Sequence, residues 1–237
     1  EGKLEWAQGY SEPGSGSDLA SLRTHAERDG DDFVLNGQKI WTSRAHHADW
    51  LFGLFRTNPD APKHRGITYL LLQMNTPGIS VRPLEQINGR NEFNEVFFED
   101  VRVPVEQTVG EINRGWYVGA THLDFERSSI GSALNMLQTL DDLRDSLEKE
   151  RESRGITRAH TQRSPTLRTE IAARYIEASV ARLFSYRVIS IQLREEVPNY
   201  GASMQKMFSD QLVQKIARTA MKTLGLYGPL WDSDDDR

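Results

Sequence analysis

Short apolar runs separated by turns fill the first half of the chain. Residues 50–55 and 67–72 are apolar and of strand length, and Thr76-Pro77-Gly78 follows the second run. This pattern predicts two buried strands. Residues 94–103 are also rich in β-forming side chains and end at Pro104, which suits a strand edge better than the centre of a sheet.

An Asn-Gly pair interrupts another extended stretch. Asn36-Gly37 lies between Phe33-Val34-Leu35 and Gln38-Lys39-Ile40-Trp41. Both residues of an Asn-Gly pair tolerate positive φ, so the sequence predicts a β-hairpin that turns at this pair.

A helical pattern replaces the strand pattern after about residue 113. Apolar and small residues recur with a period near 3.6 over 171–185 and over 201–224, and Gly225 is placed to end the second helix. We expect a further helix over 115–149. Residues 150–164 are polar and weakly periodic, which predicts a mobile loop.

Composition indicates a globular protein and excludes several classes. The chain has 237 residues, 38% of them hydrophobic, a net charge of -5 and no cysteine. No apolar run is long enough for a membrane span, and no signal peptide is recognisable. The acidic balance gives no reason to bind nucleic acid. Without cysteine there is no disulfide or thiolate chemistry, which fits a cytoplasmic location.

The stretch from Tyr10 to Asp18 is rich in glycine and serine. Such glycines permit close backbone approach to a ligand, and the serines offer compact hydrogen-bond donors. Composition alone favours a plain surface loop. A dinucleotide-binding Rossmann loop is excluded because Gly-x-Gly-x-x-Gly is absent.

Trp41 precedes a hydroxyl side chain, Ser43, by two positions on an extended segment, so both are expected on one side of it. The indole could pack on a flavin ring while a hydroxyl or amide meets the polar edge of that ring. A core tryptophan beside the strand residue Thr42 explains the same spacing.

Asp124-Phe125-Glu126-Arg127 lies on a predicted helix. An arginine can bind a carboxylate or phosphate, and a carboxylate in a dry site can act as a base. From these residues alone, a solvated helix face or a structural ion pair is the favoured interpretation. The adjacent His46 and His47 lack a suitably spaced partner, so no metal site is expected.

Together these segments resemble the acyl-CoA dehydrogenase family. The resemblance rests on residues 10–18 followed by 36–43, and continues through 93–104, Gly115-Trp116 and the helices. It implies that the chain binds FAD, with Ser17 also near the acyl-CoA. The residues implicated in flavin binding are Gln8, Gly9, Tyr10, Ser11, Ser17, Trp41, Thr42 and Ser43.

The resemblance also implies the architecture. We expect an α+β multidomain fold, with an antiparallel β-barrel-like middle domain over residues 1–112 and an incomplete up-down helical bundle over 113–237. The chain starts at Glu1 and ends in an acidic run, so we expect truncation at both ends.

The implied reaction is FAD-dependent α,β-dehydrogenation of an acyl-CoA thioester in fatty acid or lipid metabolism. In the isovaleryl-CoA and long-chain branches of the family, the catalytic base occupies the position of Glu126, which would remove an α proton while hydride passes to flavin N5. Asp124 and Arg127 match residues near the pantetheine and the substrate. Electron-transfer flavoprotein or a similar acceptor and a homo- or hetero-oligomeric assembly are the implied partners.

Two departures keep other functions open. The Arg-x-x-Phe-Gly motif of many members is missing from residues 150–164, and 224–228 keeps only part of a glycine-rich turn. In the family, both reach the FAD of a neighbouring subunit. An acyl-CoA oxidase of the same architecture and a non-catalytic flavin-binding subunit are the alternatives.

Overall fold

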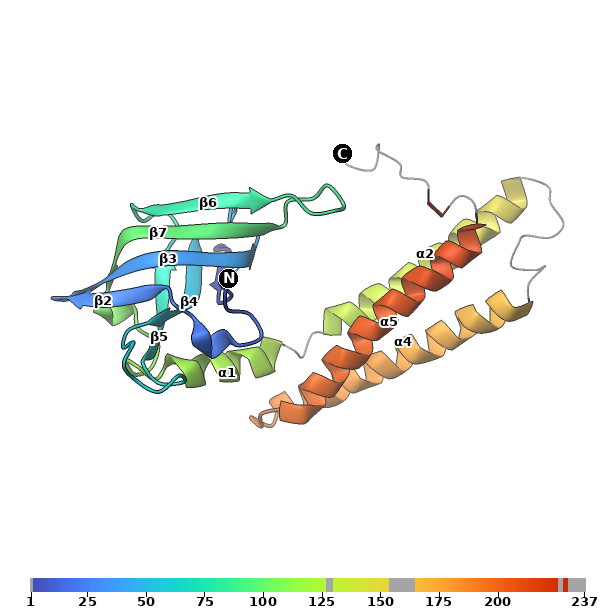
Figure 1. Cartoon of the computed structure of the whole chain (residues 1–237). Coiled ribbons are helices and arrows are strands. Elements are labelled where there is room, and N and C mark those ends of the chain that lie inside the picture. The colour runs from blue at the N-terminus through green and yellow to red at the C-terminus, as the bar shows by residue number, and fades with distance from the viewer. Residues whose placement is uncertain (1, 127–129, 154–164, 226–227, 230–237) are drawn as a thin grey trace. The chain divides into compact units, whose positions relative to one another are not determined.

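The chain forms two compact units in a computed structural model that describes residues 2–126, 130–153, 165–225 and 228–229 (Figure 1). One unit comprises Glu1–His122 and the other Leu123–Arg237. The division falls within a helix, α1 (Gly115–Glu126). The domain assignment of 1–112 and 113–237 stays a prediction.

The first unit is a curled seven-stranded sheet. The strand path is β1-β4-β2-β3-β7-β6, with β5 paired to β4. Its strands are β1 (Trp6–Gly9), β2 (His25–Asp29), β3 (Asp32–Ser43), β4 (Trp50–Arg56), β5 (Ile67–Gln73), β6 (Ile79–Leu84) and β7 (Phe93–Pro104). Two short 3-10 helices, η1 (Leu19–Ser21) and η2 (Val105–Gln107), follow β1 and β7.

The expected α+β class is confirmed, and the predicted strands over 50–55 and 67–72 are β4 and β5. The sheet is mixed rather than wholly antiparallel, because β4 pairs in parallel with β1 and β2. Apolar side chains from both arms of the curled sheet form its core. They include Phe33, Leu35, Leu51, Phe55, Leu70, Leu72, Val96 and Phe98.

The predicted hairpin at Asn36-Gly37 is wrong. Both residues lie inside the single strand β3, where the pairing with β7 has a bulge between Leu35 and Gly37. The side chain of Asn36 exchanges two hydrogen bonds of 2.9 Å with Asp100 on β7, and Gly37 has a φ of 142°. The turn preceding β3 instead contains Gly30, with a φ of 65°. The Asn-Gly pair therefore marks a bulge, where glycine supplies the same conformational freedom.

Three long helices dominate the second unit. They are α2 (Ile130–Ser153), α4 (Pro165–Gln192) and α5 (Asn199–Leu224), and α4 packs on both others. Figure 1 shows them running up, down and up within this unit, as expected for an up-down bundle.

The helices differ in detail from the prediction. The sequence predicts a single helix over 115–149, but the structure has two, α1 and α2. The residues between them, 127–129, lie outside the described part. Helix α2 extends to Ser153, so the first residues of the predicted loop are helical, and 154–164 lie outside the described part. Gly225 ends α5 with a φ of 58°, as predicted. None of the described helices is long and apolar enough to span a bilayer.

Candidate functional site

The glycine-serine loop that follows β1 has a defined shape. The backbones of Glu12 and Ser15 exchange two hydrogen bonds of 2.8 and 3.0 Å across Pro13-Gly14. The Ser15 hydroxyl donates to the carbonyls of Asp18 and Leu19. A Cβ placed on Gly14 or Gly16 would meet no atom within 4 Å, so the outer side of this loop is open.

The residues at the start of the loop are packed against the sheet. Gly9 and Tyr10 are buried, and a Cβ on Gly9 would lie 2.8 Å from a methyl carbon of Leu51, so a larger residue there would require the Leu51 side chain to shift. Ser11 accepts a backbone hydrogen bond of 2.9 Å from Ile40 on β3. Ser17 is exposed on the open part of the loop. Gln8 is half-buried on β1.

A second bulge displaces the end of β3, between Lys39 and Thr42. Trp41 has a φ of 60°, which is rare for a bulky residue, and its side chain is 59% exposed. Its indole meets the ring of Phe93 edge-on, with centroids 6.1 Å apart. A core position for this tryptophan is thereby excluded. An exposed indole held by a strained backbone is suited to stacking on a ligand.

Thr42 points the other way and is fully buried. Its carbonyl accepts a hydrogen bond of 3.0 Å from the Asn94 side chain, whereas its hydroxyl oxygen has no partner among the described residues. This hydroxyl is therefore closed off from the side of β3 on which the indole of Trp41 is exposed. Ser43, at the end of β3, is exposed.

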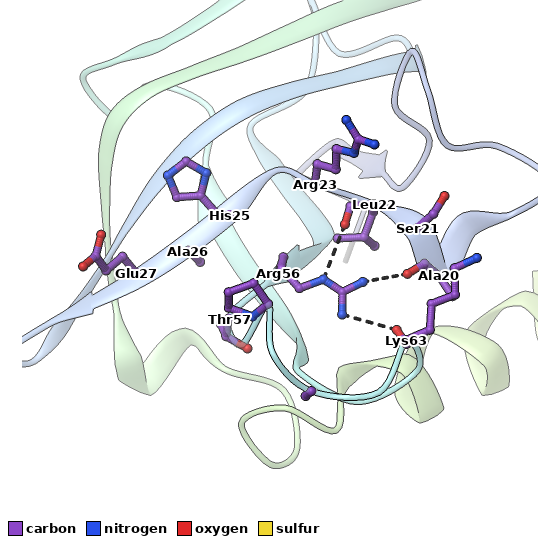
Figure 2. Close-up of a pocket in the computed structure, with 12 residues that line it drawn as sticks. Ala20, Ser21, Leu22, Arg23, His25, Ala26, Glu27, Arg56, Thr57 and Lys63 are labelled. Carbon is purple, nitrogen blue, oxygen red and sulfur yellow. Dashed lines mark hydrogen bonds between the residues drawn. The ribbon is translucent and has the colours of Figure 1, made fainter.

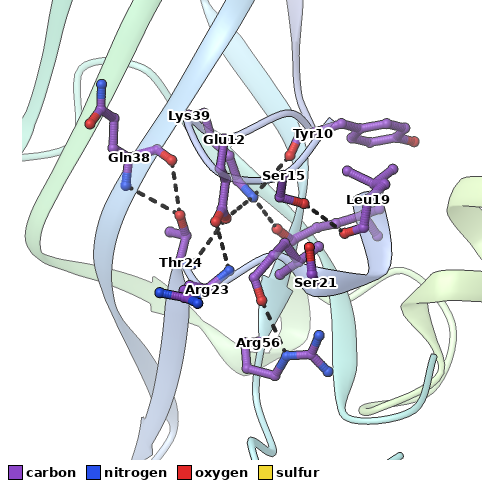
Figure 3. A network of polar contacts seen from close by, with 12 residues as sticks. Tyr10, Glu12, Ser15, Leu19, Ser21, Arg23, Thr24, Gln38, Lys39 and Arg56 are labelled. Atoms are coloured by element: carbon purple, nitrogen blue, oxygen red, sulfur yellow. Dashed lines mark hydrogen bonds and ion pairs between the residues drawn. The ribbon is translucent and has the colours of Figure 1, made fainter. Parts of the chain in front are cut away.

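An ion pair joins the loop to β3. Lys39 is fully buried, and its Nζ lies 2.8 Å from Oε1 of Glu12, whose side chain is 7% exposed. The same Nζ donates to the carbonyls of Tyr10, at 3.2 Å, and Leu54, at 2.7 Å. The Glu12 carboxylate also accepts the backbone N–H groups of Arg23 and Thr24. Figure 3 shows this network between the loop and β3.

The pKa of Glu12 reflects this environment. Burial opposes ionisation of the carboxyl, but the ammonium of Lys39 and the backbone donors outweigh burial and lower the pKa below its usual range. Sequence reasoning gave no role to either residue. The available signal was a lysine at an inward-facing position of a strand, which calls for a buried carboxylate.

Tyr10 lies in an aromatic cluster behind the loop. Its hydroxyl is 3.4 Å from that of Tyr69 on β5 and 3.3 Å from Nδ1 of His122 on α1. The Phe52 ring contacts all three rings, with centroids 4.9 to 6.1 Å apart. Burial raises the pKa of Tyr69, so its hydroxyl stays protonated. Because Tyr10 is the first residue of the loop, its packing in this cluster fixes the start of the loop against the core.

A cleft of about 840 Å³ lies beside the loop, between η1, β2 and the segment after β4 (Figure 2). Its lining includes Arg23, His25, Arg56 and Lys63. The guanidinium of Arg56 is engaged by carbonyls, including those of Ala20 and Leu22. Arg23 is exposed, and its guanidinium has no ion-pair partner among the described residues. Arg23 therefore offers a positive charge at this cleft, whose lining also includes the carboxylate of Glu27.

The predicted base lies in the other unit. Glu126 is the last residue of α1, and its side chain is exposed. Asp124 is half-buried on the same helix, and residues two apart in a helix do not share a face. Arg127 lies outside the described residues. No group of three or more potential metal ligands occurs in the described part of the chain.

The sequence matches two consecutive family descriptions. Residues 7–101 match "Acyl-CoA dehydrogenase, middle domain" and residues 113–236 match "Acyl-CoA dehydrogenase, C-terminal domain". The chain belongs to the acyl-CoA dehydrogenase family. The resemblance seen in the loop and strand segments is thereby confirmed.

Named relatives agree with this family assignment. The acyl-CoA dehydrogenase IpdE1 of Mycobacterium tuberculosis is 45% identical over 176 residues, which cover 69% of this chain and 46% of that protein. A solved structure titled "Tcur3481-Tcur3483 steroid ACAD G363A variant" is 33% identical with a TM-score of 0.85, covering 97% of this chain and 58% of that chain.

The ChsE4-ChsE5 complex from Mycobacterium tuberculosis also matches, at 36% identity and a TM-score of 0.80, over 96% of this chain and 57% of the solved chain. This acyl-CoA dehydrogenase family chain thus spans about half the length of the relatives it matches.

Proposed function

We propose that this protein holds FAD on its β unit and dehydrogenates acyl-CoA thioesters between the α and β carbons. The observation that carries the proposal is the exposed indole of Trp41 at the bulge of β3, together with the open outer side of the glycine-serine loop. The indole would supply a planar apolar face and the loop would supply polar donors, both of which an isoalloxazine ring requires.

The proposed flavin contacts come from the end of β3 and from the glycine-serine loop with the strand before it. Trp41 would stack on the ring, and Ser43 would offer its hydroxyl to the polar edge of the ring. Thr42, whose side chain faces the core, would contribute through its backbone. The remaining contacts would come from Gln8, Gly9, Tyr10, Ser11 and Ser17 of the loop and the strand before it. When bound, the flavin supplies the hydride acceptor for the reaction.

Glu126 is proposed as the base that takes the α proton. General-base catalysis by a positioned carboxylate accelerates a reaction by about 10²–10⁴-fold. The Glu126 side chain is exposed, so bound substrate must displace water from around the carboxylate for efficient proton transfer. Ser17, Asp124 and Arg127 are assigned to the substrate. Arg23, an exposed arginine that lines the cleft, would bind the phosphates of the substrate.

A steroid-derived CoA thioester is the first substrate to test, because one matching structure is titled as a steroid acyl-CoA dehydrogenase. A hetero-oligomer is proposed for the same kind of reason, since another match is a complex of ChsE4 with ChsE5. Electron-transfer flavoprotein or a similar carrier would reoxidise the cofactor, and a cytoplasmic location is proposed.

Flavin absorbance of the intact protein, purified with any subunit that accompanies it, tests the proposal. We expect bound FAD that bleaches when a CoA thioester is added without oxygen. Trp41→Ala should weaken FAD binding about tenfold or more, because stacking on an indole is lost. Trp6→Ala, at a tryptophan 45% exposed in the same unit, is the matched control.

Three results would redirect the assignment. Peroxide formation under air without an added acceptor would favour the oxidase. Bound FAD without bleaching by any thioester would favour a non-catalytic flavin-binding subunit. Protein that binds neither FAD nor CoA thioesters would contradict the proposal.

A further inference from the structure

Lys39 is fully buried, yet it is not among the residues assigned to the flavin or the substrate. An ammonium group has three protons, and here each has an acceptor, two of them in the glycine-serine loop and one on β4. The acceptors are the carbonyl of Tyr10, the carboxylate of Glu12 and the carbonyl of Leu54 on β4. Lys39, which belongs to β3, therefore connects this strand by hydrogen bonds to the loop and to β4.

Stability alone does not account for such a pair. Desolvating two charges offsets much of their attraction, and apolar residues of similar volume often stabilise a core as well or better. What a buried pair with directional hydrogen bonds supplies is a fixed geometry. The fixed element here is the backbone at the start of the glycine-serine loop.

The pair is connected to the proposed flavin contacts by short paths. Lys39 donates a hydrogen bond to the Tyr10 carbonyl. The residues that follow these two, Ile40 on β3 and Ser11 in the loop, share a backbone hydrogen bond of 2.9 Å. Trp41 follows directly, at the bulge that exposes its indole. On the other side, Glu12 begins the turn that closes on Ser15.

We infer that the Glu12–Lys39 ion pair is a positioning device that preorganises the flavin site, holding the loop against β3 before the cofactor arrives. The inference rests on the proposed function, because it assigns a role toward FAD to two residues that do not contact it. A preformed loop lowers the ordering cost of binding and so raises affinity.

Reconstitution of the intact apoprotein with FAD tests this role. Lys39→Met keeps the aliphatic stem and removes the ammonium, and we expect its dissociation constant for FAD to rise about tenfold or more. The visible spectrum of the flavin that does bind should shift, because the loop no longer holds one geometry. Arg102→Met is the matched control, since Arg102 pairs with Asp29 and Asp32 on the exposed side of the same unit.

The double variant Glu12→Gln with Lys39→Met separates positioning from folding. Both charges are gone, so the fold should recover relative to the single variant. Flavin affinity should stay low, because the neutral pair no longer bonds the Tyr10 carbonyl. A double variant with wild-type affinity and spectrum would overturn the inference, as would a folded single variant that binds FAD normally.

Hydrogen exchange in the wild-type apoprotein decides the question if the variants do not fold. The amides of Arg23, Thr24 and Ile40 bond to the Glu12 carboxylate and the Ser11 carbonyl. We expect them to be protected before FAD is added. Rapid exchange that slows only with FAD would show that the cofactor orders the loop and would refute preorganisation.

These outcomes differ from those of the proposed function. If wild-type protein binds no FAD at all, the proposed function fails. If wild-type protein binds FAD and the folded variants bind it equally well, only the positioning role of Glu12 and Lys39 fails.

Discussion

Two ion pairs, one from each unit, use charged side chains in opposite ways. In the β unit, the Glu12–Lys39 pair is almost completely buried, and backbone groups complete its hydrogen bonds. In the helical unit, the Lys206–Asp210 pair on α5 is more than half exposed. A solvated pair exchanges readily with water and fixes little, whereas a buried pair admits few geometries. Burial, rather than the number of ion pairs, indicates where this chain specifies a precise arrangement.

Glu126→Gln should produce the largest effect, which is on turnover. It also tests the contrast between exposed and buried charges, because Glu126 is an exposed carboxylate of the helical unit that is proposed to act as the catalytic base. Turnover should fall about 10²–10⁴-fold, while FAD content and the unfolding temperature stay unchanged. Stopped-flow measurement of flavin bleaching checks this, with Asp210→Asn as the matched exposed control. Bleaching at the wild-type rate would assign the base elsewhere.

Lys39→Met should have the next largest effect, on stability. Removing one partner leaves the Glu12 carboxylate buried without its counter-ion, which costs about 3–5 kcal/mol. Urea unfolding followed by tryptophan fluorescence measures the loss. If Arg102→Met destabilises the protein as much, burial does not distinguish the two kinds of pair.

Acid should destabilise the β unit through Glu12, because the pKa of this carboxyl is lowered in the folded state, whereas in the unfolded chain it has the ordinary value of about 4.3. The resulting stability is fully present above that ordinary value and is lost as pH falls through the lower folded value. Lys39 and Arg56 are the cations that face the carboxylate, and burial lowers the pKa of each, while falling pH favours the protonated form of both. Unfolding free energies measured down the acid range should fall more steeply for the wild type than for Glu12→Gln. Parallel curves would contradict the assignment.

Lys206→Met should have the smallest effect. An exposed pair spaced four residues apart on a helix contributes about 0.3–0.5 kcal/mol. The change in urea midpoint should be close to the measurement error and should shrink further in high salt. A loss comparable to that of Lys39→Met would break the comparison between the two units.

The sequence predicted the long regular elements well. Periodic apolar positions locate α4 and α5, and Gly225 ends α5 as its conformational freedom suggests. Asn36-Gly37 misled because the same preference for positive φ serves a hairpin turn and a bulge. Pairing with β7 and the contacts of Asn36 with Asp100 decide between them, and these are remote in sequence.

The candidate site was predictable only in part. The resemblance named Trp41 and the loop, but not the bulge that turns the indole outward. Lys39 carried a usable signal, an inward-facing lysine, yet its partner Glu12 lies 27 positions away, and spacing along the chain does not reveal such a pair. Tertiary packing decides which polar residues are buried together.

The Glu12–Lys39 pair also constrains how this chain can evolve. Replacing either residue first leaves the other charge buried without a counter-ion, so each single substitution on the way to a different pair destabilises the protein. Arginine is a poor replacement for Lys39, because the donors of its planar guanidinium do not match three acceptors that surround one nitrogen. Positions 12 and 39 should therefore vary among descendants together or not at all.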